Sequence, residues 1–163
     1  MGQMKINLTK GVIPMHVAIG CDHHGVALKA AIAQDLRARG IEVTDCGSDG
    51  KDMSDYPVFI RRVAKMVQQG QCDRGIVLCG TGIGACIAAN KVHGIRCALC
   101  GDLYSAKLTR MHNDSNVLSL GADLTGTVLA LQIVRLWLET PFEGGRHQRR
   151  IDMVRQMELE EKE

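Results

Sequence analysis

One cysteine stands at the junction between a short apolar segment and a glycine-rich loop. Residues 76–78 form a brief β-branched run bounded by glycines, which predicts a buried strand ending near Cys79. Glycines let backbone N–H groups turn toward an anion, and the alanine-rich helix expected after the loop would point its positive end at the same place. Such donors favour a thiolate over a thiol, so the stretch indicates a base beside an anion-binding cradle. The cradle residues are Gly80, Thr81, Gly82, Ile83 and Gly84.

A pair of arginines near the C-terminal end could bind the anion itself. Arg146 and Arg150 are one helical turn apart, so both guanidinium groups can face one anion, and two preceding glycines would allow close approach. The alternative is a solvated basic face, which is the commoner fate of surface arginines.

Composition limits the class of protein. The 163 residues fit one domain, which we place at 15–163 after an N-terminal extension at 1–14. Lys and Arg number 20 against 18 Asp and Glu, and aromatic residues are 3%, which argues against a nucleic-acid or membrane surface. The sequence shows neither a run of eighteen apolar residues nor a signal peptide, so we expect a cytoplasmic protein.

The seven cysteines are predicted to be mostly small buried residues, because an odd number without a secretory signal does not indicate a disulfide framework. Cys97 and Cys100 form a CxxC, but they lie on a predicted strand, where residues three apart point to opposite faces. A zinc or redox pair is therefore not expected there.

Apolar spacing predicts alternating strands and helices along the chain. Strands are expected at 15–20, 41–45, 76–79, 95–100 and 117–120, and helices at 26–38, 56–69, from 83 onward, 103–111, 125–138 and 146–161. This order is typical of a three-layer α/β/α sandwich around a five-stranded parallel sheet. Ligands bind such sheets beyond the carboxyl ends of the strands. If strands one and three are neighbours, Cys21, Asp22, His23 and His24 face the cradle residues across that crevice.

Six motifs together resemble one family. They are CDHHG, DYP, LCGTGIG, AANKVHGIRCAL, YSAKLTRMHND and FEGGRHQRRI, and the resemblance runs from about residue 15 to residue 151. The chain is similar to the ribose-5-phosphate isomerase type B and galactose-6-phosphate isomerase family. The resemblance implies a Rossmann-like sheet of order 2-1-3-5-4 and an aldose–ketose isomerase that acts on a phosphorylated sugar without metal or cofactor.

The resemblance also implies roles for individual residues. Cys79 matches the base that moves a proton between two carbons, and residues 80–84 match the loop that holds the enediolate oxygens. His112 matches the histidine that opens the sugar ring, a step that suits imidazole near neutral pH. The remaining matches are substrate contacts: Asp22, His23, Asn113, Arg146 and Arg150. From the residues alone, Asp22 is explained equally well as a cap of the first helix. A histidine at the end of a helix, such as His112, is more often a helix cap than a catalytic residue.

One position departs from the family pattern. Asp123 stands where the family often has a basic residue, and a carboxylate repels phosphate. Ribose 5-phosphate is the leading substrate, with allose 6-phosphate, galactose 6-phosphate or a tetrose phosphate as alternatives. A dinucleotide site is a rival, because residues 80–85 satisfy G-x-G-x-x-A and Asp102 lies at a suitable distance, but the motif follows the third strand rather than the first. A sugar-phosphate sensor on the same fold is a further alternative.

Topology predicts a site shared between two chains. Cys79 follows a strand and His112 precedes one, so a parallel arrangement puts them at opposite edges of the sheet. Both can act on one sugar only if His112 comes from a second molecule. We therefore expect a homodimer with composite sites, alone or as a dimer of dimers.

Overall fold

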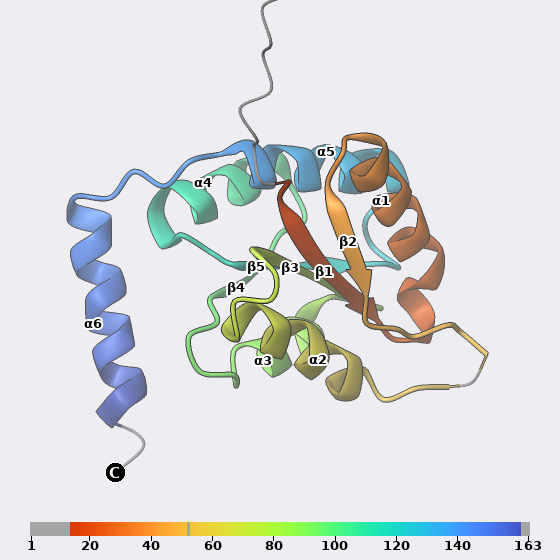
Figure 1. Cartoon of the computed structure of the whole chain (residues 1–163), viewed down its shortest axis with the longest axis horizontal. Coiled ribbons are helices and arrows are strands. Elements are labelled where there is room, and N and C mark those ends of the chain that lie inside the picture. Colours follow the sequence, from red (N-terminus) through yellow and green to blue (C-terminus); the bar gives the residue numbers. More distant parts are fainter. Residues whose placement is uncertain (1–13, 52, 161–163) are drawn as a thin grey trace, which may run out of the picture.

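The computed structural model describes residues 14–51 and 53–160 and shows five parallel strands (Figure 1). Their spatial order, β2-β1-β3-β5-β4, confirms the predicted topology. The strands are β1 His16–Cys21, β2 Glu42–Asp45, β3 Arg74–Cys79, β4 Cys97–Leu99 and β5 Val117–Gly121. The helices are α1 Val26–Ala38, α2 Tyr56–Gln68, α3 Ile83–Ala89, α4 Leu103–Asn113, α5 Thr127–Glu139 and α6 Arg146–Glu160, with a single 3-10 turn, η1 His23–Gly25. The expected extension at 1–14 lies outside the described residues except for Pro14.

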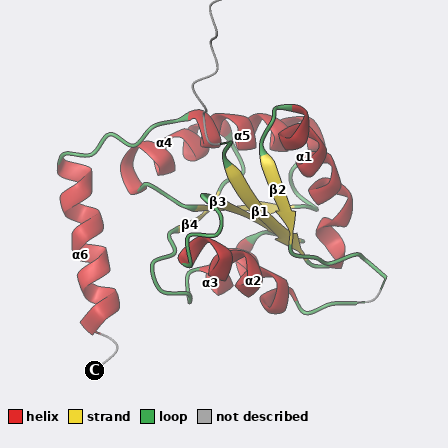
Figure 2. Ribbon diagram, viewed as in Figure 1, coloured by secondary structure: helices red, strands yellow, loops and turns green. Residues whose placement is uncertain are grey.

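Helices cover both faces of the sheet, as Figure 2 shows. Helices α1, α4 and α5 pack on one face, while α2 and α3 pack on the other. Successive residues of β3 alternate between these two cores: Ile76 and Leu78 face the first, and Val77 and Cys79 face the second. The predicted three-layer sandwich is confirmed.

The predicted boundaries of the fourth strand were wrong because side chains, and not a neighbouring strand, accept the backbone hydrogen bonds at its start. The strand expected at 95–100 is only Cys97–Leu99. Just before it, the Arg96 N–H donates to Asn116 Oδ1 at 2.8 Å, and the Cys97 N–H donates to Asn90 Oδ1 at 2.8 Å. The other expected elements exist and differ by a few residues at their ends, such as the last helix before α6, which begins at Thr127 rather than at 125.

Helix α6 lies beside the β4 side of the molecule and stands apart from the three layers (Figure 1). Its last turns are tied to the body by Glu158, whose carboxylate accepts from the Gly94 N–H at 2.9 Å and pairs with His93 at 3.2 Å. Among the described residues, no helix is both long and apolar enough to cross a membrane.

The cysteines are all free, and the two residues of the CxxC lie on opposite faces as predicted. Cys86 and Cys97 form a different pair, between α3 and β4. The hydrogen bond from the Cys97 thiol lowers the pKa of Cys86 to about 7 against the opposing effect of burial, and the Leu99 N–H and the Asn90 amide assist. The same interaction and burial raise the pKa of Cys97.

Cys86 should therefore be the thiolate of this pair near neutral pH. We expect its alkylation by iodoacetamide to rise with pH and to reach half its maximum near pH 7, because the species that reacts is the thiolate. Peptide mass spectrometry measures the labelled fraction of Cys86 at each pH. The experiment covers about pH 5–10, the range in which most protein cysteines titrate.

Two comparisons control the labelling experiment. Cys100 is 1% exposed and its pKa is raised to about 11, chiefly by burial, so it should stay unlabelled at neutral pH. Cys97→Ala should move the Cys86 profile to higher pH. A profile that this substitution leaves unchanged would contradict the assigned donor.

Candidate active site

The cradle predicted after β3 lies at the carboxyl edge of the sheet. Cys79 is the last residue of β3 and is 5% exposed. The loop that follows β5 is tied directly to it, because the Ala122 N–H donates to the Cys79 carbonyl and the Asp123 N–H donates to the Gly80 carbonyl, both at 2.9 Å. Two neighbouring strands thus fix the position of the candidate base.

The conformation of the cradle depends on Gly82. This residue has a φ of 77°, and an added Cβ would lie 2.8 Å from the Leu120 carbonyl carbon, so another side chain does not fit. The buried Ser119 hydroxyl donates to the Gly82 carbonyl at 2.7 Å, and the Ile83 N–H donates to Thr81 Oγ1 at 3.3 Å. Helix α3 then begins directly at Ile83, with its N-terminal end at the cradle.

Asp22 and His23 lie at the carboxyl edge of the sheet, as Cys79 does, and Asp22 caps a turn there. Asp22 is 6% exposed, and its Oδ1 accepts the His24 N–H at 2.9 Å, which caps the η1 turn. The geometry shows this capping role, and the substrate contact expected of Asp22 stays a prediction. His23 is half-buried, and its Nδ1 accepts the Ser54 N–H at 3.3 Å.

An ion pair that the sequence did not predict covers the cradle. His24 Nδ1 lies 3.0 Å from Asp123 Oδ2, and the two side chains are 45% and 54% exposed. The same carboxylate oxygen would lie 2.8 Å from a Cβ on Gly80, so Asp123 sits directly over the first cradle residue. The family departure noted in the sequence thus falls within the site.

His112 lies at the other edge of the sheet, in the last turn of α4. The end of this helix is fixed by Asp114, which has a φ of 44° and pairs with Arg110 at 2.8 Å and with Arg96 at 3.2 Å. Arg96 Nε also donates to the Asn113 carbonyl at 2.9 Å. These contacts hold the His112 imidazole at the wall of a cavity of about 950 Å³ between α6 and the body of the domain.

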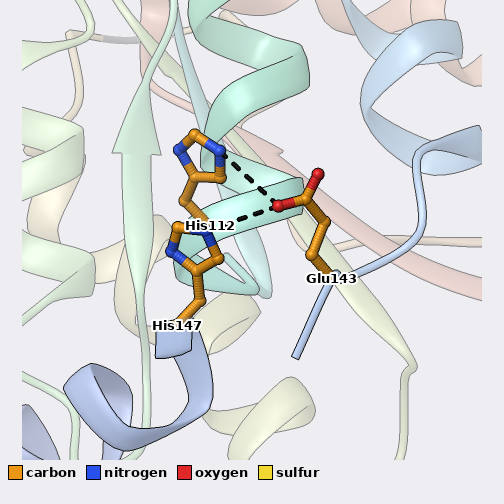
Figure 3. Close-up of side chains that lie close together, drawn as sticks. All are labelled: His112, Glu143 and His147. Atoms are coloured by element: carbon orange, nitrogen blue, oxygen red, sulfur yellow. Dashed lines mark ion pairs between the residues drawn. The ribbon is translucent and has the colours of Figure 1, made fainter. Parts of the chain in front are cut away.

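Two further residues gather around His112 (Figure 3). The Oε2 atom of Glu143 lies 3.3 Å from His147 Nε2 and 3.9 Å from His112 Nε2. The two imidazole rings stack with their centroids 4.2 Å apart and their planes at 8°. Burial lowers the pKa of His147, and the nearby charges of His112 and Arg146 lower it further against the opposing effect of Glu143.

The arginine pair begins α6, and its members differ in position. Arg150 lines the cavity together with His112 and Asn113. Arg146 is exposed in the first turn and is not one of the lining residues. None of the described residues from 79 to 84 lines this cavity either.

The candidate residues therefore form two groups at opposite edges of one sheet. Asp22, His23 and the cradle lie with Cys79, while Asn113 and the arginines lie with His112. The six residues of β3 separate these edges by about 17 Å at the rise of an extended strand. Within one chain, Cys79 and His112 cannot reach the same small molecule.

Sequence reasoning missed the neighbours of both groups. Nothing in the sequence joins His24 to Asp123 or Glu143 to His112, because each pair is far apart in the chain. The FEGGRH motif contained Glu143 and His147, but only its arginine had drawn attention. Asp102, the acid required by a dinucleotide site, caps α4 by accepting the Ser105 N–H at 2.7 Å.

Comparison with known proteins gives the family. The family model described as Ribose/Galactose Isomerase matches residues 17–154. Ribose-5-phosphate isomerase B of Escherichia coli (strain K12) is 47% identical over 142 residues, which are 87% of this chain and 95% of that protein. D-erythrulose-4-phosphate isomerase of Pectobacterium atrosepticum is 41% identical over 149 residues, 91% of this chain and 98% of that protein.

A solved structure agrees with the fold as well. Ribose-5-phosphate isomerase B from Mycoplasma genitalium, crystallised with bound ribulose 5-phosphate, superposes with a TM-score of 0.87 at 40% identity and covers 90% of this chain and 97% of its own. The sheet order, the matched motifs and these similarities agree along nearly the whole domain. The chain is therefore an isomerase that belongs to the ribose/galactose isomerase family.

Proposed function

We propose that the protein interconverts ribose 5-phosphate and ribulose 5-phosphate through an enediolate in the cytoplasm. The observation that carries the proposal is Cys79, a cysteine held at the end of β3 directly before an amide-rich cradle and a helix N-terminus. Relatives that bear the name ribose-5-phosphate isomerase B, and the one solved with ribulose 5-phosphate, support this choice of substrate.

The proposed mechanism needs only side chains and backbone amides. His112 gives a proton to the ring oxygen as the furanose opens. The Cys79 thiolate then removes the proton from C2, the electrons move to the carbonyl oxygen, and the enediolate forms. Return of that proton to C1, together with transfer of the O2 proton to O1, gives the ketose, so the thiolate is regenerated and no redox partner is consumed. Amides of residues 80–84 stabilise the charge that develops on the enediolate oxygens.

Phosphate binding is assigned to the arginine pair. Arg150 lines the cavity beside His112, and Arg146 is one turn earlier on α6. In a shared site these arginines would come from one chain and Asp123 from the other, so the guanidinium groups would attract the phosphate that Asp123 repels. A tetrose phosphate is a second candidate substrate, and its shorter carbon chain would bring its phosphate closer to the cradle and to Asp123. A relative named D-erythrulose-4-phosphate isomerase gives this alternative a precedent.

A second copy of the chain completes the proposed site. Exposed apolar side chains cluster on α3, on β4 and at the start of α4, next to the cradle's helix: Ile83, Ile87, Leu99, Leu103 and Tyr104. Val154 and Met157 are also exposed on α6, which stands apart from the sandwich. Burial of these surfaces against a partner would stabilise a homodimer. In that dimer His112 of each chain would approach Cys79 of the other.

The first test measures turnover with purified protein. A coupled assay should show conversion of ribose 5-phosphate faster than of erythrulose 4-phosphate or of the 6-phosphate sugars. Cys79→Ala should lower kcat by about a thousandfold or more, because the proton acceptor is lost. Cys72→Ala is the matched control, since that cysteine is equally buried but lies before β3 at the other edge. Near-normal turnover in the Cys79 variant would reject it as the base.

The second test concerns phosphate recognition. Arg150→Ala should lower kcat/KM for a phosphorylated sugar by about thirtyfold, the equivalent of ~2 kcal/mol for a lost charged hydrogen bond. Arg149→Ala removes an adjacent exposed arginine that does not line the cavity and should change kcat/KM little. Equal effects of the two substitutions would indicate a general loss of positive charge and not a specific contact.

The third test asks whether the site is shared. The Cys79→Ala and His112→Ala proteins are mixed with each other, dissociated and reassembled. A mixed dimer holds one site with both residues and one with neither, so random pairing should restore about a quarter of wild-type activity. Both parents must be folded, and exchange is verified by mass spectrometry of isotope-labelled chains. An inactive mixture despite proven exchange would refute the composite site.

A further inference from the structure

We propose that His112, Glu143 and His147 form a zinc-binding site. Their ligand atoms all lie within 4.8 Å of one another, and they come from three separate segments: the last turn of α4, the loop before α6 and the first turn of α6 (Figure 3). One oxygen and two imidazole nitrogens form the donor set of many zinc sites that keep a fourth position open.

The loop backbone holds these side chains in place before any ion binds. The Glu143 N–H donates to the Met111 carbonyl at 3.1 Å, which fixes the glutamate against the end of α4 beside His112. The His147 N–H donates to the Gly144 carbonyl at 3.0 Å, across a turn in which Gly144 has a φ of 67°. The backbone therefore places the acid and the second histidine next to His112 before any ion binds, and only the side chains have to rearrange on binding.

An unpartnered nitrogen points to a ligand at this place. His147 is 5% exposed, and its Nε2 atom has no hydrogen-bond partner among the described residues, although the Glu143 carboxylate lies 3.3 Å away. Leaving a buried polar atom unsatisfied is unfavourable, and native structures usually provide a partner. A cation between the imidazole and the carboxylate would supply one.

The geometry selects zinc over hard cations. In a tetrahedral site with bonds of about 2.0–2.1 Å, ligand atoms lie roughly 3.4 Å apart, close to the separations of 3.3 Å and 3.9 Å from Glu143 to the two histidines. The stacked rings must splay from their 8° alignment so that both nitrogens face the ion. Magnesium and calcium require mostly oxygen ligands, and this cluster offers a single carboxylate.

The surrounding charges set the strength and the consequence of binding. Arg146 and Arg150 lie on α6, the helix that carries His147. Their positive charges repel a cation, so the site should bind zinc reversibly. If the proposed function holds, a zinc ion on His112 Nε2 occupies the nitrogen needed for ring opening. Zinc would then inhibit the isomerase, and a chelator would restore it.

Binding is measured without substrate, by calorimetric titration of the metal-free protein with zinc chloride. His147→Gln and Glu143→Gln should each weaken binding by at least about tenfold, because each removes one of three ligands. His93→Gln is the matched control, since His93 pairs with one carboxylate, Glu158 at 3.2 Å, without a third ligand. Circular dichroism verifies folding, and the exposed Glu143 provides a variant that does not disturb the core.

Cobalt substitution distinguishes this site from the cysteines. Co²⁺ bound by nitrogen and oxygen shows no thiolate charge-transfer band, whereas cysteine binding does. Zinc affinity that is unchanged in both the His147 and Glu143 variants, or a thiolate band that disappears in Cys79→Ala, would overturn the proposal. If the metal-free protein is inactive toward every phosphorylated sugar but binds zinc through these three side chains, that result would contradict the proposed function alone.

Discussion

Because all five strands run parallel, every loop that follows a strand lies at one edge of the sheet and every loop that precedes one lies at the other. This constraint places Cys79 and His112 at opposite edges, and no rearrangement of side chains within one chain can bring them together. Neither edge holds a complete set of groups for proton transfer on a phosphorylated sugar. The first has the proposed base, Cys79, and the loop amides, and the second has the proposed acid–base residue, His112, and the arginines. The proposed dimer follows from that division.

Strand β5 connects the two halves within each chain. Its beginning, at Val117, follows directly on the segment that fixes the end of α4 beyond His112. Its other end shapes the cradle, since Ser119 binds the Gly82 carbonyl and the next loop places Asp123 over Gly80. All five residues of β5 are buried. This buried strand thus fixes the distance between the cradle and His112 of one chain. In the proposed dimer these two act on different substrate molecules.

The sequence was informative where one physical effect dominated. Short β-branched runs predicted the strands, and the resemblance gave their order. Prediction failed at β4, where the side-chain amides of Asn90 and Asn116 replace ladder partners, a choice that local hydrophobicity does not encode. In the site, glycine content predicted the turn between β3 and α3, in which Gly82 has a φ of 77°. The cluster around His112 was missed because it depends on how the loop before α6 turns back onto α4, through contacts between residues more than thirty positions apart.

The arrangement around His112 has two chemical consequences that arise from the same atoms. A histidine that transfers protons must be held in one orientation, and stacking on His147 with Glu143 nearby restricts the ring in this way. Yet a carboxylate and two imidazoles held within reach of one another are also ligands for a divalent cation such as zinc. Arg146 and Arg150 act against that second outcome, because positive charge beside the cluster disfavours a cation while it attracts phosphate. The balance between isomerase chemistry and metal binding at this edge is therefore set by the charge of α6.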